Sequence, residues 1–375
     1  MPVQASSDKV NWAKHCCLQA LIELGTRALH QPMTIICQPP PPDRQFSCGN
    51  LVPLGFLLRA LNASLPYTKK IEELRASLNH HLLAARQGQL WAFHSVHPIT
   101  CTDSVLVLQG LLGTQSDLQL KASVAALEIF ADFQGGYHPQ PLLHQQHSKN
   151  QRHLRQSDYA TTCLVKWLRK EVGFTQTTSV SYLATDFENR SSLYFANPYF
   201  VDWALAMAIS QDESAFDLRA KLRREILASL NDDYSFGLYN VALSTALAIL
   251  SLAALGDRSH ILRLAQLRLL EFMQPQGTFP EAIPFYSSLS TDDSTDPMQM
   301  CLSEYFVQAK GENFAISYYI DKHSMITTAL AYLALSESSP EKLTPEIIKD
   351  TETHPRYCCR SHGEYIAKFA LPPYV

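Results

Sequence analysis

One aspartate, Asp103, stands at the entrance of a strongly apolar segment and is the residue best placed for chemistry. After Ser104, the segment up to Leu111 contains Gln109 as its one polar residue, which predicts a helix buried on most sides. Thr102 and Asp103 occupy the positions of an N-cap. Asp103 is therefore either a solvated cap that the helix dipole favours or a buried acid that faces an apolar cavity.

Two other groups of residues have spacings known from metal sites. The segment Asp292–Asp296 spells the Asp-Asp-x-x-Asp string with which class I terpene synthases bind magnesium diphosphate on a helix. Here the string lies among turn-forming residues, and we expect a solvated loop. Cys358, Cys359 and His362 could ligate zinc, as Cys and His do in lanthionine cyclases. Adjacent cysteines rarely both bind one ion, so we predict no metal site.

Aromatic residues gather in the connections before the apolar segments, often beside glycine. Such side chains can line a cavity and stabilise a cation by about 0.5–2 kcal/mol each, or they can form ordinary core. Tyr199 and Trp203 are four residues apart, so we expect them to share one helix face. The candidates for a cavity wall are Trp91, Phe195, Tyr199, Phe200, Trp203, Phe236, Tyr239, Phe285 and Tyr286.

These residues must be positioned by helices, because the chain repeats a pair of segments, one apolar and one amphipathic. A first helix is predicted at about 9–29. Apolar helices are predicted at about 50–61, 103–112, 198–209, 239–255 and 323–335, with a helix at 157–170 that mixes apolar residues with Asp158. Amphipathic or charged helices are predicted at about 67–87, 116–133, 213–230 and 260–273. Nothing alternates strongly enough to indicate a large sheet.

Apolar helices that alternate with amphipathic ones predict an inner ring inside an outer ring. The fold class is therefore all-α, an α/α toroid similar to an α6-α6 barrel. We expect a single domain over 1–375, with the repeat core at about 50–337. In such a ring, Asp103 and the aromatic turns would lie at the same end.

Composition narrows the possible partners. The chain of 375 residues has a net charge of −4 and no basic block, which argues against nucleic acid. Nine cysteines without a signal peptide indicate reduced thiols in the cytoplasm. The longest apolar helix, Val241 to Leu255, falls short of the roughly 20 residues that span a bilayer. We expect a soluble protein of undetermined oligomeric state.

The turns and the apolar helices together resemble the α/α-barrel of class II terpene cyclases and protein prenyltransferase β-subunits. The segment Gln274–Pro280 is similar to the repeat turn of squalene–hopene cyclases, and Thr102–Val105 falls where the family carries its acid motif. The resemblance covers about residues 50–337, a length sufficient for one barrel. The chain looks most like the single-domain cyclases of meroterpenoid pathways, of the merosterolic acid synthase type, which act on a prenylated aromatic acid.

This resemblance implies that Asp103 protonates an alkene of a polyprenyl chain and that the carbocation then cyclises in a dry cavity with aromatic walls. No cofactor is implied, and peripheral contact with a membrane would deliver the lipophilic substrate. The usual motif is Asp-x-Asp-Asp, whereas here Thr102 and Ser104 replace the neighbouring carboxylates. The second carboxyl oxygen of Asp103 needs a donor, for which the candidates are His94, His97, Cys101 and Ser104.

Two other functions stay open at the level of sequence. A zinc-dependent prenyltransferase β-subunit would use an Asp-x-Cys pair and a histidine that opens a late inner helix. His323 fits the histidine, but Asp257-Arg258-Ser259 lacks the thiol. The chain could also bind a prenylated molecule without catalysis. A metal assay tests the prenyltransferase alternative, and turnover of a polyprenyl substrate would distinguish an enzyme from a non-catalytic binder.

Overall fold

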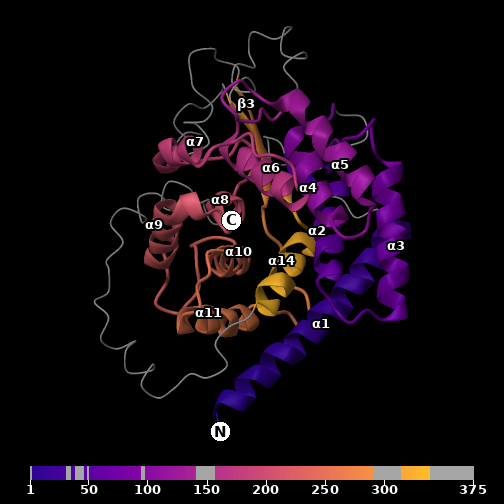
Figure 1. Cartoon of the computed structure of the whole chain (residues 1–375). Coiled ribbons are helices and arrows are strands. Elements are labelled where there is room, and N and C mark those ends of the chain that lie inside the picture. The colour runs from indigo at the N-terminus through magenta and orange to yellow at the C-terminus, as the bar shows by residue number, and fades with distance from the viewer. Residues whose placement is uncertain are drawn as a thin grey trace.

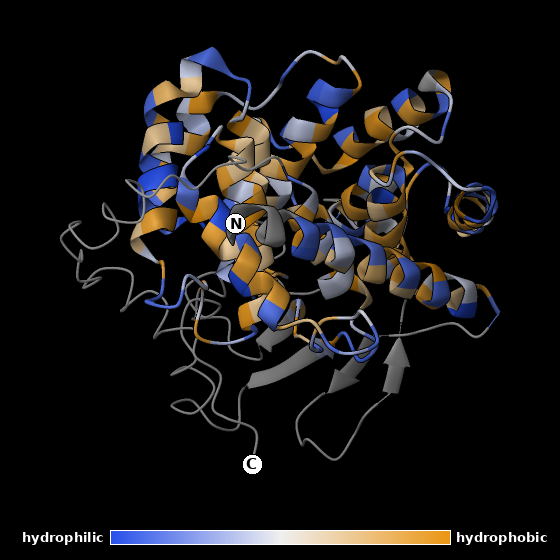
Figure 2. Cartoon of the chain, turned by 90° about the horizontal axis from the view of Figure 1, so that it is seen from below, coloured by the Kyte–Doolittle hydropathy of each residue, from blue (hydrophilic) through white to orange (hydrophobic). Residues whose placement is uncertain are grey.

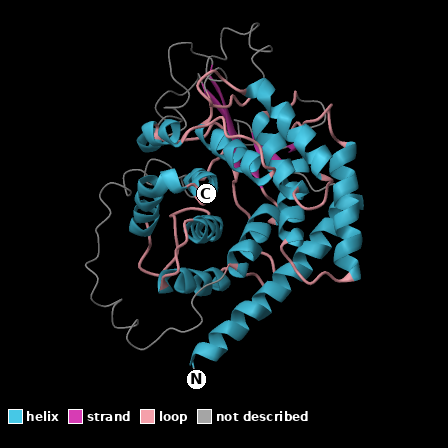
Figure 3. Ribbon diagram, in the orientation of Figure 1, coloured by secondary structure: helices cyan, strands magenta, loops and turns pink. Residues whose placement is uncertain are grey.

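Helices dominate the structure, a computed structural model that describes residues 2–30, 35–38, 46–48, 50–93, 98–140, 157–290 and 314–337 (Figure 3). Along the chain these helices alternate between two layers (Figure 1). The predicted all-α class and the two-layer arrangement are therefore confirmed. None of the described helices is both long and apolar enough to cross a membrane.

Six of the described helices form a closed inner ring. Each packs against the next, and the last packs against the first. Their side chains are almost all buried, as expected for helices covered on every side. In chain order they are α2 (Leu51–Asn62), α4 (Cys101–Leu111), α6 (Tyr159–Glu171), α8 (Pro198–Ile209), α10 (Val241–Ala254) and α14 (Met325–Ser336).

The outer layer consists of α1 (Pro2–His30), which precedes the first inner helix, and of helices that lie between consecutive inner ones in the sequence. The latter are α3 (Lys69–Ala84), α5 (Asp117–Ala126), α7 (Val180–Thr185), α9 (Phe216–Ala228) and α11 (His260–Glu271). The helices α3, α5, α9 and α11 pack on α2, α4, α8 and α10, and α1 packs on α14. Figure 2 shows hydrophilic and hydrophobic residues mixed on these helices. Because each outer helix reverses the chain, the inner helices run parallel, and their N-termini share one end of the ring.

The aromatic repeat turns have a common structural role. In each turn a fully buried aromatic residue donates its backbone N–H to a Ser or Thr hydroxyl about one turn into the next inner helix. The four pairs are Trp91 with Ser104 (3.0 Å), Tyr137 with Thr162 (2.9 Å), Phe236 with Thr245 (3.0 Å) and Phe279 with Thr328 (3.1 Å). These bonds fix each turn to the start of its inner helix.

The helices α2 and α4 cross at very short distance, which two glycines permit. A Cβ atom on Gly55 would lie 2.7 Å from the carbonyl oxygen of Leu106, and one on Gly110 would overlap the carbonyl oxygen of Gly55. The backbones therefore touch where larger side chains would force them apart.

A small antiparallel sheet with strand order β2-β1-β4-β3 was not predicted. Its strands are β1 (Ile35–Gln38), β2 (Phe46–Cys48), β3 (Phe285–Ser290) and β4 (Phe314–Ile320). Strand β3 begins beside Phe195, just before α8, and β4 ends just before α14. The sheet is thus attached to the N-terminal end of the ring, where Phe285 pairs with Tyr319.

Candidate active site

Asp103 lies in the first turn of α4, at the N-terminal end of the ring, and is 8% exposed. The N-cap is Thr100, so the prediction of Thr102 and Asp103 as cap was wrong by one turn. The Thr100 hydroxyl accepts the Asp103 N–H at 3.0 Å and donates to Asp103 Oδ2 at 2.6 Å. Burial raises the pKa of Asp103 to about 6, although hydrogen bonds from Thr100 and the Phe93 backbone act in the opposite direction. The structure therefore favours the buried acid over the solvated cap.

The predicted donors to Asp103 have other partners or lie outside the described residues. The Ser104 hydroxyl donates to the carbonyl oxygens of Trp91 and Thr100, at 3.0 and 2.6 Å. Cys101 is fully buried, and burial keeps the pKa of its thiol well above the usual value. His94 and His97 lie outside the described residues.

Thr100 is the donor that the sequence analysis missed. A threonine three residues before an acid is the spacing of a capping box, which was the available signal. Neighbouring Thr102 does not assist, because its hydroxyl pairs with that of Thr161 on α6 at 2.7 Å.

Asp158 and Asp321 are also buried at this end of the ring, and both cap helices. The oxygens of Asp158 accept backbone N–H groups at 2.7 and 2.6 Å, and burial raises its pKa. Asp321 accepts three backbone N–H groups of the first turn of α14, at 2.8 to 3.2 Å, and burial raises its pKa to about 6. Asp103 differs from Asp321 because a side-chain hydroxyl, that of Thr100, donates to its Oδ2.

Four of the predicted aromatic residues lie together in the ring. Phe195 stacks on Phe200 with ring centroids 4.9 Å apart, and Phe285 lies 6.0 Å from Phe200. Phe200 meets Trp203 edge-on at 6.1 Å. These two residues are three apart on α8 and share the inward face.

Three aromatic residues that the sequence analysis missed complete this group. Phe56 of α2 lies 6.1 Å from Phe200 and 6.3 Å from Trp203. Phe93 contacts Phe285 at 6.5 Å and Tyr319 at 4.9 Å. Tyr319 could not be found because β4 was not predicted. We name these rings the interior aromatic cluster: Phe56, Phe93, Phe195, Phe200, Trp203, Phe285 and Tyr319.

Trp91 and Phe236, both predicted in the cavity wall, belong instead to the repeat turns. The indole of Trp91 donates to the carbonyl oxygen of Leu82 on outer helix α3 at 2.7 Å. Phe236 is fully buried and packs edge-on against Tyr199 at 6.1 Å. The glycine-rich turns therefore anchor the inner helices to the outer layer.

The other three aromatic candidates also lie apart from the interior aromatic cluster. The hydroxyl of Tyr199 donates to Ser229 at the end of α9, at 2.9 Å. A buried phenol needs a hydrogen-bond partner, which the outer layer supplies. Tyr239 is 37% exposed. Tyr286 donates to the carbonyl oxygen of Ser192 at 3.0 Å.

The zinc alternative finds no support in the described residues. Asp257 follows the C-terminus of α10 and pairs with Arg223 at 2.6 Å, whereas exposed His323 precedes α14. The two therefore lie at opposite ends of the ring. No group of three or more His, Cys, Asp or Glu side chains in the described part of the chain could hold a metal ion. The predicted loop 292–296 and the residues Cys358, Cys359 and His362 lie outside it.

A surface pocket of about 390 Å³ lies elsewhere, at the ends of α10 and α11. Asn231, Leu238, Arg268 and Phe272 are among its lining residues. Neither Asp103 nor the interior aromatic cluster borders it, so it is not the site of the predicted chemistry.

No family model and no curated protein sequence matches the chain. Solved structures do match it in fold. Type II terpene cyclase MstE from Scytonema, in complex with the product merosterolic acid A, superposes with a TM-score of 0.67 at 14% identity, over 89% of this chain and 98% of that one. MstE in complex with the substrate geranylgeranyl dihydroxybenzoate gives 0.66 at 13% identity with the same coverage.

A longer cyclase also matches. ent-Copalyl diphosphate synthase from Streptomyces platensis gives a TM-score of 0.51 at 16% identity, over 77% of this chain and 50% of that chain. The chain therefore has the fold of the type II terpene cyclases, and it spans nearly the full length of the single-barrel example.

Proposed function

We propose that this protein is a class II terpene cyclase that protonates and cyclises the polyprenyl chain of a prenylated aromatic acid. The observation that carries the proposal is the position of Asp103, a buried acid with a pKa raised to about 6 beside a continuous group of aromatic rings. The fold shared with MstE, whose substrate is geranylgeranyl dihydroxybenzoate, supports the substrate class.

In the proposed reaction, the protonated carboxyl of Asp103 transfers its proton to the terminal alkene of the substrate. Because Thr100 donates to Oδ2, the carboxylate that remains is stabilised and the proton is released more easily. The internal alkenes then attack the cation in turn, and loss of a proton ends the cascade. The faces of the interior aromatic cluster would stabilise the moving charge without acting as nucleophiles.

The same rings exclude water, which would otherwise trap the carbocation. Phe56, Phe200 and Trp203 are 0% exposed and touch one another, so substrate binding must separate them. The rings would then both shape the polyene and shield it. No metal or other cofactor is needed for a step that begins with a Brønsted acid.

We further propose that the described ring is part of one domain over 1–375 and that the enzyme works in the cytoplasm. Reduced Cys16, Cys17, Cys101 and Cys163 are compatible with that compartment. Peripheral membrane contact would supply the lipophilic substrate.

The test is incubation of the wild-type protein with geranylgeranyl dihydroxybenzoate, geranylgeraniol and geranylgeranyl diphosphate, followed by chromatography and mass spectrometry. We expect a product isomeric with the dihydroxybenzoate, and none from Asp103→Asn. Asp321→Asn is the matched control, because it removes an equally buried acid that only caps a helix. Cyclisation by Asp103→Asn at the wild-type rate would contradict the proposal, and turnover of the diphosphate alone would redirect it.

A further inference from the structure

An arginine of intermediate exposure, Arg59, lies in the ring beyond the interior aromatic cluster. It belongs to the last turn of α2, and its guanidinium lies between two indole rings, 4.9 Å from the centroid of Trp203 and 5.1 Å from that of Trp167. One of its N–H groups donates to Gln109 Oε1. A guanidinium sandwiched in this way keeps the remaining N–H groups of its plane available for a ligand.

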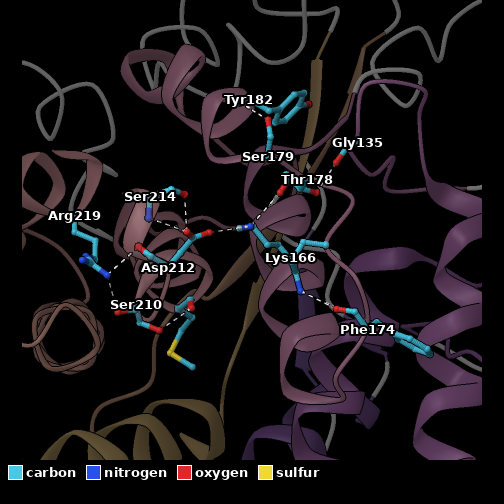
Figure 4. Close-up of polar contacts among 12 residues, drawn as sticks. Gly135, Lys166, Phe174, Thr178, Ser179, Tyr182, Ser210, Asp212, Ser214 and Arg219 are labelled. Atoms are coloured by element: carbon cyan, nitrogen blue, oxygen red, sulfur yellow. Dashed lines mark hydrogen bonds and ion pairs between the residues drawn. The ribbon is translucent and has the colours of Figure 1, made fainter. Parts of the chain in front are cut away.

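Three more deeply buried cations each have a carboxylate partner, unlike Arg59 in the described part of the chain. Lys166 pairs with Asp212 at 3.4 Å and donates to the Thr178 carbonyl oxygen at 3.0 Å (Figure 4). Arg169 pairs with Glu128, and Arg190 with Asp202 at 2.8 Å. Within the described part of the chain, no carboxylate forms an ion pair with Arg59.

The charge of Arg59 is nevertheless retained. Burial lowers its pKa to about 10, and the carboxylates of Glu171 and Glu337 partly offset that shift from beyond ion-pair distance. The guanidinium therefore stays protonated at neutral pH. A largely desolvated charge without a counter-ion is costly, which makes Arg59 a candidate for binding a ligand of opposite charge.

Two unpartnered N–H donors lie beside the guanidinium. Gln109 is 2% exposed and Trp203 is 0% exposed, yet Gln109 Nε2 and Trp203 Nε1 have no hydrogen-bond partner. Both residues contact Arg59. Buried donors are usually satisfied, so two orphans next to an unpaired cation indicate a missing acceptor.

We propose that Arg59, Gln109 and Trp203 form the seat of the substrate's carboxylate. This inference rests on the proposed function and adds where the head group binds. A carboxylate fits because it is planar, carries one negative charge and can accept two hydrogen bonds from one guanidinium. A diphosphate fits poorly, because a single arginine would face several charges, with Glu171 and Glu337 in the vicinity.

The seat also orients the substrate. Gln109 follows Asp103 by six residues on α4, a rise of about 9 Å toward the C-terminal end of the ring. Phe200 contacts Trp203, which in turn contacts Arg59. A head group held at Arg59 would therefore leave the distal alkene of the prenyl chain to reach Asp103.

Binding to the Asp103→Asn protein tests the seat without turnover. Isothermal titration calorimetry would compare geranylgeranyl dihydroxybenzoate with its methyl ester, which keeps the shape but loses the charge. We expect the acid to bind about 10- to 100-fold more tightly, the effect of a charge-assisted hydrogen-bonded pair. Adding Arg59→Gln should abolish this preference and leave the affinity for the ester unchanged.

Gln109→Glu provides a second variant that keeps the arginine. Its new carboxylate would pair with Arg59 internally, so the acid should again lose its advantage over the ester. Equal affinities of acid and ester for the Asp103→Asn protein, or a preference that survives both variants, would overturn the seat. The proposed function is judged separately: if the wild-type protein forms no cyclic product while the preference holds, cyclisation is refuted and the seat is not.

Discussion

At the scale of single residues, the proposed reaction makes the rate depend on the protonation state of Asp103. A pKa of about 6 leaves roughly one molecule in ten protonated at pH 7. Desolvation by the bound substrate would increase that fraction. The environment of Asp103 therefore decides whether it can act as an acid, and that environment could not be derived from the sequence.

The dependence of rate on pH follows from this pKa. Because the protonated form is the active one, kcat/KM should be constant well below pH 6 and fall about tenfold per pH unit well above it. Initial rates between pH 5 and 9, with protein shown to be folded throughout, provide the measurement. A rate that rises with pH over this range would mean that Asp103 acts as a carboxylate.

The free energy of unfolding should also depend on the protonation of Asp103. Burial raises the folded-state pKa of Asp103 above its unfolded value, so its contribution to the free energy of unfolding is lost as pH rises through about 6. Asp103→Asn should therefore be more stable than the wild type at pH 8, by about 1–3 kcal/mol, and gain nothing at pH 4.

Asp321→Asn is again the control, because an amide cannot replace both oxygens that cap α14. At pH 4, where linkage contributes nothing, Asp321→Asn should lose about 1 kcal/mol or more, whereas Asp103→Asn should be unchanged. Thermal or urea denaturation of the wild type and both variants at pH 4 and pH 8 measures these changes. A larger loss for Asp103→Asn at pH 8 than at pH 4 would show that its carboxylate stabilises the fold.

Replacing each of two buried tryptophans by alanine distinguishes the role of the interior aromatic cluster from that of the repeat turns. Trp203→Ala removes a ring of the interior aromatic cluster, so substrate should still be consumed but yield incompletely cyclised or hydroxylated products. Trp91→Ala should cost a similar 3–5 kcal/mol or so of stability and leave the product unchanged. Product analysis beside a thermal melt compares them, and identical products from both variants would remove Trp203 from the site.

At the scale of elements, the pattern of apolar and amphipathic segments predicted most helices. A helix buried on all sides is apolar throughout, whereas a helix buried on one side has apolar residues on that face alone. Helix α7 and the sheet were missed. The sheet joins short strands from distant parts of the chain, and such pairing leaves little local signal. The predicted aromatic residues divide between the interior aromatic cluster and the repeat turns. The sequence shows which residues precede a helix but not which layer they face.

The crossing of α2 and α4 gives a prediction at this scale. Gly110→Ala would place a Cβ against the carbonyl oxygen of Gly55 and should lower stability by about 1–3 kcal/mol, despite the better helix propensity of alanine. Gly113→Ala is the control: its φ of +77° is strained for alanine, but no atom lies within 4 Å of the new Cβ. Chemical denaturation should rank Gly110→Ala as the more damaging change. The reverse order would mean that the backbone contact can relax.

At the scale of the whole molecule, the closed ring arranges the groups of the proposed reaction along its axis. Parallel inner helices place Asp103, Asp158 and Asp321 at one end, and Arg59 lies toward the other. The rings of Phe200, Phe56 and Trp203 lie between. The sequence analysis placed Asp103 at the correct end, but closure of the ring by α14 on α2 and the inward position of Arg59 needed the structure.

The most direct test of the account is the cyclisation of geranylgeranyl dihydroxybenzoate by the wild-type protein in D₂O, with EDTA present. A reaction that begins with proton transfer from Asp103 predicts a cyclic product with one non-exchangeable deuterium at the carbon that is protonated first. The same product without deuterium should form in H₂O at the mass of the substrate. A cyclic product that gains no deuterium from D₂O, or a reaction abolished by EDTA, would contradict initiation by a Brønsted acid.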